Sequence, residues 1–255
     1  MKLISELSVI IPAYNESENI IRNIEIVIQE LEKIVDDYEI VIIDDGSKDG
    51  TYTLVREMFI ENDRVNIYKN PKNLGKGAAI RKGINYANKY YTVLIDADLD
   101  LHPRQIKRLF GVLYSSKADI VIGSKFHPDS DIDYPVGRGV MSLIYFMLIK
   151  LLFKLPCRDT QTGLKLFKTK VLKDVLPLQI DRFAYDLEIL VKANNLGYEI
   201  LESPIILNSQ RKFNRIGLKG IFFIIWDTLR VWINKQRGYY VKDKARESLK
   251  NRFGS

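Results

Sequence analysis

Cysteine and histidine are both scarce in this sequence. It contains one cysteine, Cys157, and two histidines, His102 and His127, in 255 residues. A single cysteine excludes a disulfide within the chain and fits a reducing compartment. Zinc sites are built from clusters of cysteine and histidine, and the sequence holds no such cluster, so we do not expect a zinc enzyme. The same scarcity argues against a hydrolase built on a Ser/His or Cys/His pair.

Two glycine-rich phosphate loops are also missing. No G-x-G-x-x-G follows the first expected strand, residues 7–11, so the sequence lacks the fingerprint of a dinucleotide-binding enzyme. Residues 73–77 contain Gly-Lys-Gly, but they have neither the spaced first glycine nor the Ser/Thr of a P-loop. A nucleotidyltransferase, which is one alternative function, would need a basic glycine-rich loop where residues 13–16 read Ala-Tyr-Asn-Glu.

No apolar run reaches the ~20 residues that a membrane-spanning helix needs. The first residues hold one lysine and a short apolar stretch broken by Pro12, which fits a strand better than a signal peptide. Of the two most apolar stretches, 140–153 is interrupted by Lys150, and 216–233 carries Lys219, Asp227 and Arg230 at intervals. We interpret both as amphipathic helices lying in a membrane surface, with ordinary core helices as the alternative. The sequence thus predicts a cytoplasmic protein, peripheral on the inner face of a membrane, without a transmembrane helix.

Positive charge is concentrated at the C-terminal end. The chain has a net charge of +7, and residues 206–255 hold 12 Lys and Arg against 3 Asp and Glu. Such a segment serves nucleic acid, an anionic membrane or solubility. Because the apolar stretch 216–233 lies within it, we expect a membrane surface as the partner and no nucleic acid. Residues 211–255 are therefore predicted to form a basic amphipathic membrane-surface extension.

Apolar runs of strand length alternate with helical patterns along the chain. The expected strands are residues 7–11, 39–43, 65–68, 92–95, 119–122 and 198–201, and the expected helices include 51–60, 78–88, 103–115 and 183–195. This alternation predicts an α/β fold with a Rossmann-like, mostly parallel central sheet and helices on both faces. Asn15 and Glu18, three residues apart, are expected to form a capping box at the start of the first helix.

Three carboxylates follow the central apolar strand. Asp96, Asp98 and Asp100 come directly after residues 92–95. Open α/β sheets bind ligands at the carboxyl ends of their strands, and carboxylates that are close together in a partly dry cleft repel each other. Mg²⁺ or Mn²⁺ would relieve this repulsion, because these ions take carboxylate oxygens together with substrate phosphates. We therefore predict a metal at Asp96 and Asp98; the alternative is a solvated acidic loop that caps the next helix.

Polar residues also follow three other expected strands. They are Tyr14, Asn15 and Glu16 after the first, Asp44 and Asp45 after the second, and Ser124 and Lys125 after the fifth. In a doubly wound sheet these strand ends form one crevice. A metal together with Lys76 and Lys125 would offset the acidic charge and allow an anionic nucleotide to bind.

Four motifs in this order resemble family 2 glycosyltransferases of the GT-A fold. They are residues 10–16 (IIPAYNE), 44–47 (DDGS), 73–77 (NLGKG) and 96–98 (DAD). Two later motifs, residues 158–167 (RDTQTGLKLF) and 181–188 (DRFAYDLE), resemble the polyprenyl-phosphate hexose synthases. Among those synthases the motifs are nearer the dolichyl-phosphate β-glucosyltransferases than the mannosyltransferases. The resemblance covers about residues 7–210.

This resemblance implies an inverting transfer of a hexose from a nucleotide sugar to a polyprenyl or dolichyl phosphate. It makes residues 1–210 the GT-A catalytic domain, with UDP-glucose as the expected donor and GDP-mannose as the alternative. Mannosyltransferases of the family often have Gln where this chain has Asp100 and Arg where it has Lys125, and Lys lacks the bidentate phosphate geometry of Arg. A catalytically silent nucleotide-sugar-binding protein that recruits partners to a membrane is an alternative of another class.

The resemblance also implies roles for single residues. Those expected to bind the nucleotide sugar are Pro12, Ala13, Tyr14, Glu16, Asp44, Asp45, Lys76, Asp96, Ala97, Asp98 and Lys125. Among them, Asp44 would hydrogen-bond the base, and Asp96 and Asp98 would hold the metal and the diphosphate. Three further carboxylates are expected to be catalytic. These are Asp159 on the acceptor side and the pair Asp186 and Glu188 beside the sugar.

Overall fold

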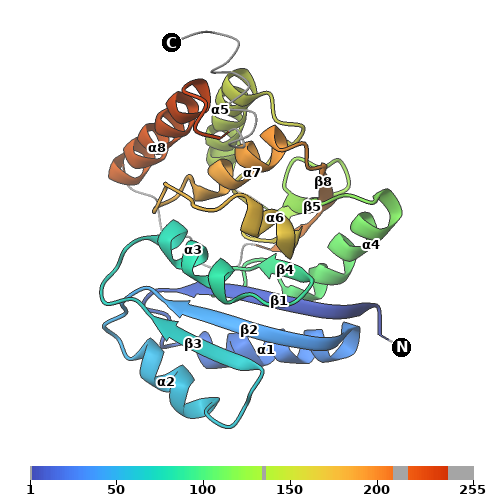
Figure 1. The fold of residues 1–255 in the computed structure, drawn as a ribbon, viewed down its shortest axis with the longest axis vertical. Coiled ribbons are helices and arrows are strands. Elements are labelled where there is room, and N and C mark those ends of the chain that lie inside the picture. The colour runs from blue at the N-terminus through green and yellow to red at the C-terminus, as the bar shows by residue number, and fades with distance from the viewer. Residues whose placement is uncertain (1, 134–135, 209–217, 241–255) are drawn as a thin grey trace, which may run out of the picture.

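A seven-stranded sheet forms the centre of the protein, whose computed structural model describes residues 2–133, 136–208 and 218–240 (Figure 1). In spatial order its strands are β3 (Val65–Lys69), β2 (Val35–Asp44), β1 (Ile4–Ala13), β4 (Tyr91–Leu94), β7 (Lys165–Lys168), β5 (Ile120–Ser124) and β8 (Ile200–Pro204). All neighbours are parallel except β7, which runs antiparallel between β4 and β5. The prediction of a mostly parallel α/β sheet is confirmed.

Helices cover both faces of this sheet, as predicted. One face carries α1 (Ile20–Ile34), α2 (Thr51–Met58), the short η1 (Pro103–Gln105) and α4 (Ile106–Ser116). The opposite face carries α3 (Lys76–Tyr86), α5 (Val136–Phe153), α6 (Thr169–Asp174), α7 (Tyr185–Asn195) and α8 (Leu218–Gln236). Alternate residues of β1 enter the two cores, Val9 and Ile11 on one side and Ile10 on the other. Each such buried side chain stabilises the fold by about 1.5–3 kcal/mol.

The register of the sheet brings several strand ends to one edge. Ala13 of β1 pairs with Asp44 of β2, and Ile10 pairs with Leu94 of β4. Because these strands are parallel, the segments that follow them leave the sheet on the same side. A pair of short strands, β6 (Asp131–Asp133) and β9 (Ile206–Asn208), lies apart from the main sheet.

The predicted capping box at the first helix is wrong. Helix α1 begins at Ile20 and has no side-chain hydrogen bond at its N-cap. Asn15 has a left-handed backbone with φ of 56°, and its side-chain oxygen accepts a hydrogen bond from the Lys48 N–H. The asparagine side chain is thus used by the backbone of a neighbouring loop and cannot cap the helix. Asparagine side chains often hydrogen-bond to nearby backbone groups in this way and so compete with helix capping.

The antiparallel strand β7 was not predicted. It is four residues long, it begins with a lysine, and its partners Leu94 and Ile122 lie far away in the sequence. A short strand that starts with a charge has no clear apolar signature, and only non-local pairing defines it. Its position matters, because it brings the motif 158–167 beside the end of β4.

Helices α5 and α8 lie side by side, at the opposite end of the molecule from α2 (Figure 1). Tyr145 and Thr228 are joined by a hydrogen bond of 3.0 Å between their hydroxyls, and Lys235 Nζ donates to the Phe153 carbonyl at 3.2 Å. Both helices also bury apolar residues, such as Phe153 and Val231, in the core. They are therefore packed onto the core on one face of the sheet, although their other sides are exposed.

Both helices expose large apolar side chains, and we call this set the α5–α8 apolar face. It consists of Met147, Leu151, Ile225, Trp226, Leu229 and Ile233. Within the described residues, none of the helices combines the length and the apolarity that crossing a bilayer requires. The predicted helices at 140–153 and 216–233 correspond to α5 and to α8, which begins at Leu218. The side chains of 136–144 and 218–222 lie outside the described residues. The predicted boundary at 210, and residues 241–255 of the extension, are also outside it.

Candidate active site

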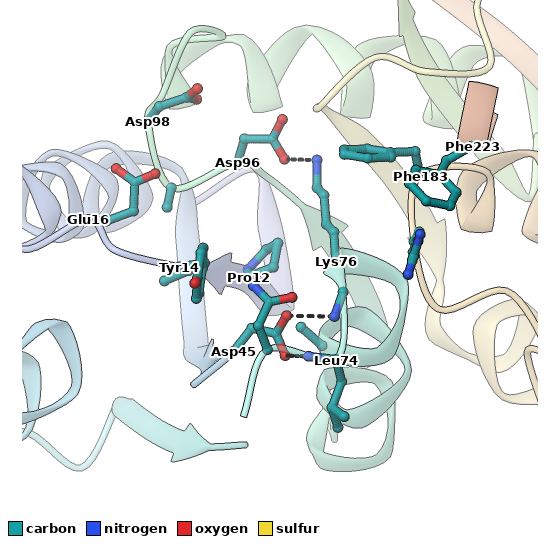
Figure 2. A pocket seen from close by; sticks show the side chains of 16 residues that line it. Pro12, Tyr14, Glu16, Asp45, Leu74, Lys76, Asp96, Asp98, Phe183 and Phe223 are labelled. Atoms are coloured by element: carbon teal, nitrogen blue, oxygen red, sulfur yellow. Dashed lines mark hydrogen bonds and ion pairs between the residues drawn. The ribbon is translucent and has the colours of Figure 1, made fainter. Parts of the chain in front are cut away.

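A cavity of about 580 Å³ opens at the edge where β1, β2 and β4 end (Figure 2). Nine residues predicted to bind a nucleotide sugar line it: Pro12, Ala13, Tyr14, Glu16, Asp45, Lys76, Asp96, Ala97 and Asp98. They come from four separate segments of the chain, which are the ends of β1, β2 and β4 and the start of α3. The cavity thus lies where we predicted a crevice from the polar residues that follow the strands.

The loop before α3 is shaped by Asp45. Its carboxylate accepts hydrogen bonds from the backbone N–H groups of Leu74 and Gly75, at 3.0 and 2.8 Å, and from Asn70 at 2.8 Å. Gly75 has φ of 105°, and a Cβ there would lie 2.3 Å from the carbonyl oxygen of Asp181. Only glycine fits both constraints. The motif 73–77 therefore fixes one wall of the cavity.

Lys76 and Asp96 form an ion pair inside the cavity. Lys76 Nζ lies 2.5 Å from Asp96 Oδ1, and Figure 2 shows this contact between the two segments. Burial alone would lower the pKa of Lys76, but the carboxylates of Asp96, Asp186 and Asp98 raise it above its ordinary value. Lys76 is therefore a cation at neutral pH and offers a positive charge to an anionic ligand.

Asp98 is a carboxylate in an unfavourable electrostatic position. Its pKa is raised to about 6 by burial and by the charges of Asp96 and Asp100, against the effect of Lys76. Asp96 and Asp98 are thus two neighbouring acidic side chains at the cavity, and the positive charge of Lys76 does not offset the effect of burial and repulsion on Asp98. No set of three or more metal-binding side chains is assembled in the described part of the chain. A pair of carboxylates fits Mg²⁺ or Mn²⁺, which complete their shell with phosphate oxygens and water.

Gly163 lies directly behind Asp96. A Cβ on residue 163 would lie 2.4 Å from Asp96 Oδ2 and 2.8 Å from Asp96 Cγ. Any other residue at this position would push the carboxylate away from its present place. The later motif 158–167 therefore supports the acidic side chains from behind.

A second, smaller cavity of about 150 Å³ adjoins Asp96. Lys125, Asp100, Gln161 and Ile205 are among the residues that line it. Lys125 is held by Asp159, which accepts the Lys125 backbone N–H at 3.0 Å and lies 3.4 Å from its ammonium. In the described part of the chain, Lys125 thus gives the small cavity a cation, and Leu101, Ile205 and Leu207 give it an apolar wall.

Four predicted site residues lie outside the linings of both cavities: Asp44, Asp159, Asp186 and Glu188. Asp44 is fully buried and accepts the Ser47 N–H at 3.2 Å. Its neighbour Asp45 reaches the cavity, since consecutive residues at a strand end point in opposite directions. Asp44 does not line the large cavity.

The remaining pair belongs to the first turn of α7. Asp186 is paired with Lys165 at 2.8 Å, and burial raises the pKa of Asp186 despite the opposing charges of Lys165 and Lys76. Glu188 is fully buried and accepts the backbone N–H groups of Gln179 and Ile180, at 2.9 Å each. Glu188 therefore holds the loop before α7, whereas Asp186 lies among the charged groups under the cavity.

Sequence reasoning missed the part of the cavity wall formed by Arg182, Phe183 and Phe223. The Arg182 guanidinium lies 4.1 Å from the centre of the Phe223 ring. Arg182 and Phe183 stand in the motif 181–188, which could have signalled them. Phe223 has no such signal, because only the packing of α8 brings it to the cavity.

Residues 8–176 match the model of the family described as Glycosyl transferase family 2. Glycosyltransferase AglD of Haloferax volcanii is 30% identical over 203 residues, which are 78% of this chain and 32% of that protein. Dolichyl-phosphate beta-glucosyltransferase of Dictyostelium discoideum is 35% identical over 214 residues, which are 78% of this chain and 65% of that protein. The chain thus spans about a third of the first relative and under two thirds of the second.

One solved structure shares the fold over most of the chain. Glucosyl-3-phosphoglycerate synthase of Mycobacterium tuberculosis, crystallised with Mn²⁺, UDP and phosphoglyceric acid, superposes with a TM-score of 0.68. The match covers 89% of this chain and 78% of that one, at 22% sequence identity. At this identity the similarity concerns the arrangement of helices and strands.

Proposed function

Because the chain belongs to glycosyl transferase family 2, we propose that it transfers a hexose from a nucleotide sugar to a polyprenyl phosphate such as dolichyl phosphate. Glucose is the favoured sugar and UDP the favoured nucleotide. The observation that carries this proposal is the meeting of Asp96, Asp98 and Lys76 in one cavity at the strand ends. The name of the Dictyostelium relative supports the acceptor and the sugar, and the UDP in the M. tuberculosis structure supports the nucleotide.

The donor would occupy the large cavity. Its nucleoside would lie against Pro12, Tyr14 and Leu74, whose surfaces line one part of the cavity, and its diphosphate would lie toward Lys76. A volume of about 580 Å³ lies within the range of small-molecule sites. Asp45, which orients the loop at Leu74 and Gly75, would shape the base pocket.

Asp96 and Asp98 would hold a divalent cation, Mg²⁺ or Mn²⁺. The raised pKa of Asp98 supports this, because a carboxylate pressed against other carboxylates gains most from a bound cation. When bound, such an ion neutralises the charge that develops on the departing nucleoside diphosphate. Lys76 would offer a further positive charge to the same group.

The acceptor needs no strong base. A phosphate monoester has a second pKa near 6, so it is already largely an anionic nucleophile at neutral pH. Attack in line with the leaving diphosphate would invert the anomeric carbon. Lys125 in the small cavity, positioned by Asp159, would stand on the acceptor side, and Asp186 would lie near the sugar. Glu188 would act through the loop it holds at Gln179 and Ile180.

A membrane surface would present the lipid acceptor. The α5–α8 apolar face offers exposed large side chains on two adjacent helices, and the exposed basic residues Lys150, Lys154, Arg230 and Arg237 lie on or beside the same helices. Apolar side chains with flanking positive charges are what helices lying in an anionic membrane surface use. The protein would thus be peripheral on the cytoplasmic face of a membrane, with residues 1–210 as catalytic domain and 211–255 as surface extension.

Gly163→Ala is expected to damage the site and spare the fold. The new Cβ would displace the Asp96 carboxylate, because it would lie 2.4 Å from Asp96 Oδ2. We expect Mn²⁺-dependent UDP binding to weaken about tenfold or more, a loss like that for disturbed metal-site neighbours, while the melting temperature changes little. Titration calorimetry and a thermal melt measure both.

Gly111→Ala is the matched control for that variant. A Cβ there meets open space within helix α4, so binding should be unchanged and stability equal or higher. Normal UDP binding by Gly163→Ala would refute the supporting role of Gly163.

The proposed function is tested with labelled UDP-glucose and GDP-mannose, a short polyprenyl phosphate and Mn²⁺ or Mg²⁺. We expect a labelled lipid from UDP-glucose that requires both the metal and the acceptor phosphate. A product from GDP-mannose alone would replace glucose by mannose. Tight binding of a nucleotide sugar with no transfer under any condition would support the silent recruiting protein instead.

A further inference from the structure

A buried lysine that the proposed reaction does not use lies under the donor cavity. Lys165 is the first residue of β7 and is 1% exposed. Its ammonium lies 2.8 Å from Asp186 Oδ1 and also donates to the carbonyl oxygen of Thr162. A buried charge is unfavourable unless an opposite charge accompanies it. The buried charge of Lys165 and the buried charge of Asp186 therefore stabilise each other.

The carboxylate of this pair is a neighbour of Lys76. Lys76 Nζ lies 5.9 Å from the centre of the ring of Tyr185, the residue before Asp186. A Cβ on Gly77 would lie 2.7 Å from the Cβ of Tyr185, so the first turns of α3 and α7 are in close contact. Against the effect of burial, Asp96 and then Asp186 raise the pKa of Lys76.

Charges of alternating sign therefore follow each other from the sheet to the cavity. The order is Lys165, Asp186, Lys76 and Asp96. The charges of two carboxylates, Asp96 and Asp186, act on Lys76, and it pairs at 2.5 Å with Asp96, which lines the cavity. The other carboxylate, Asp186, is already paired with Lys165.

We propose that Lys165 is a positioning residue for Lys76: it neutralises Asp186 and so leaves the Lys76 ammonium at the cavity, where the diphosphate of a donor binds. Without Lys165, Asp186 would be a buried carboxylate in need of a cation, and Lys76 is the next cation whose charge acts on it. Lys76 would then turn from Asp96 to Asp186 and leave the cavity. The identity of the diphosphate rests on the proposed function, whereas the position of Lys76 does not.

The first test compares UDP binding in the presence of Mn²⁺ among four forms of the protein. Lys165→Met keeps the length of the side chain and removes its charge, and we expect it to fold and to bind UDP about tenfold or more weakly, because a charge-assisted hydrogen bond is lost. Lys165→Arg keeps the charge and should bind like the wild type. The double variant Lys165→Met with Asp186→Asn removes the carboxylate that would capture Lys76, and it should recover the lost affinity.

The second test needs no nucleotide. Acetylation of Lys76 by a lysine reagent, followed by mass spectrometry, reports whether its amine faces the cavity. Relative to Lys170, an exposed lysine on α6, the rate at Lys76 should fall several-fold in Lys165→Met and return in the double variant. If the wild type binds neither UDP nor GDP, the proposed function fails, and acetylation still decides the role of Lys165.

Three results would each overturn this role. They are wild-type UDP affinity and Lys76 acetylation in Lys165→Met, a double variant as impaired as the single one, and failure of Lys165→Met to fold. Failure to fold would contradict the proposal because Lys76 is expected to neutralise Asp186 in Lys165→Met and so to keep the variant folded. A purely structural role for Lys165 gives no recovery when Asp186 is also changed.

Discussion

Asp98→Ala is expected to abolish hexose transfer. The side chain borders the large cavity, the proposed donor site, beside Asp96, and its raised pKa, about 6, reflects burial and repulsion by Asp96 and Asp100. Losing it would remove one of two proposed metal ligands and with it the neutralisation of the leaving diphosphate. The removal of one such electrostatic group lowers turnover by about 10²–10³-fold in well-studied enzymes, and we expect at least that loss in kcat/KM.

The metal-free fold should not suffer from this change. Removing a carboxylate that neighbouring carboxylates repel removes an unfavourable electrostatic interaction. The melting temperature without metal should therefore be equal to or above that of the wild type. Asp36→Ala, which removes an exposed carboxylate at the start of β2, serves as the control and should leave turnover unchanged. A folded Asp98→Ala protein with turnover within about tenfold of the wild type would contradict the metal role.

Leu151→Asp combined with Trp226→Asp is expected to abolish binding to anionic vesicles. These residues belong to the α5–α8 apolar face and are 77% and 60% exposed. Burying two such side chains in a membrane surface contributes about 1.5–3 kcal/mol each, which together is a hundredfold or more in partitioning. Basic residues add about 1 kcal/mol each near an anionic surface, so salt should weaken wild-type binding without abolishing it. Co-sedimentation with vesicles measures both effects.

Met58→Asp with Ile60→Asp provides the matched control. These side chains are 59% and 73% exposed at and just after the end of α2, a helix at the opposite end of the molecule from α5 and α8. The same change in chemistry there should leave vesicle binding intact. Both double variants should melt like the wild type, because they place charges where water already reaches. Wild-type protein that stays in the supernatant at low salt would refute the membrane face, and unfolding of the Leu151 and Trp226 variant would assign those residues to the core.

Local patterns in the sequence were sufficient for much of the fold and the site. Apolar runs ending in polar residues predict strands whose carboxyl ends meet, and the structure places Tyr14, Asp45, Lys76 and Asp96 around one cavity accordingly. This works because each such strand carries its signal within a few residues, and because parallel pairing forces the ends to one edge. The metal prediction at Asp96 and Asp98 rests on the same local chemistry.

Other features were decided only by tertiary structure. The capping box at Asn15 failed because a distant backbone group, the Lys48 N–H, took its side chain. At the end of β2, the direction in which the strand leaves the sheet sends Asp45 and not Asp44 to the cavity. Phe223 reaches the cavity only through the packing of α8. None of these follows from spacing, because each depends on groups that the folded chain brings from elsewhere.

The buried charges show most clearly which features local sequence determines and which only tertiary structure determines. The sequence by itself determined that this chain forms a parallel α/β sheet with carboxylates at its edge, since periodicity and residue type act locally. It did not determine that the antiparallel strand β7 would bring Gly163 behind Asp96 and Lys165 against Asp186. Pairings between residues far apart in the sequence leave no local periodicity. Burial then fixes which charges must be partners, because an unpaired charge inside the protein is too unfavourable to persist.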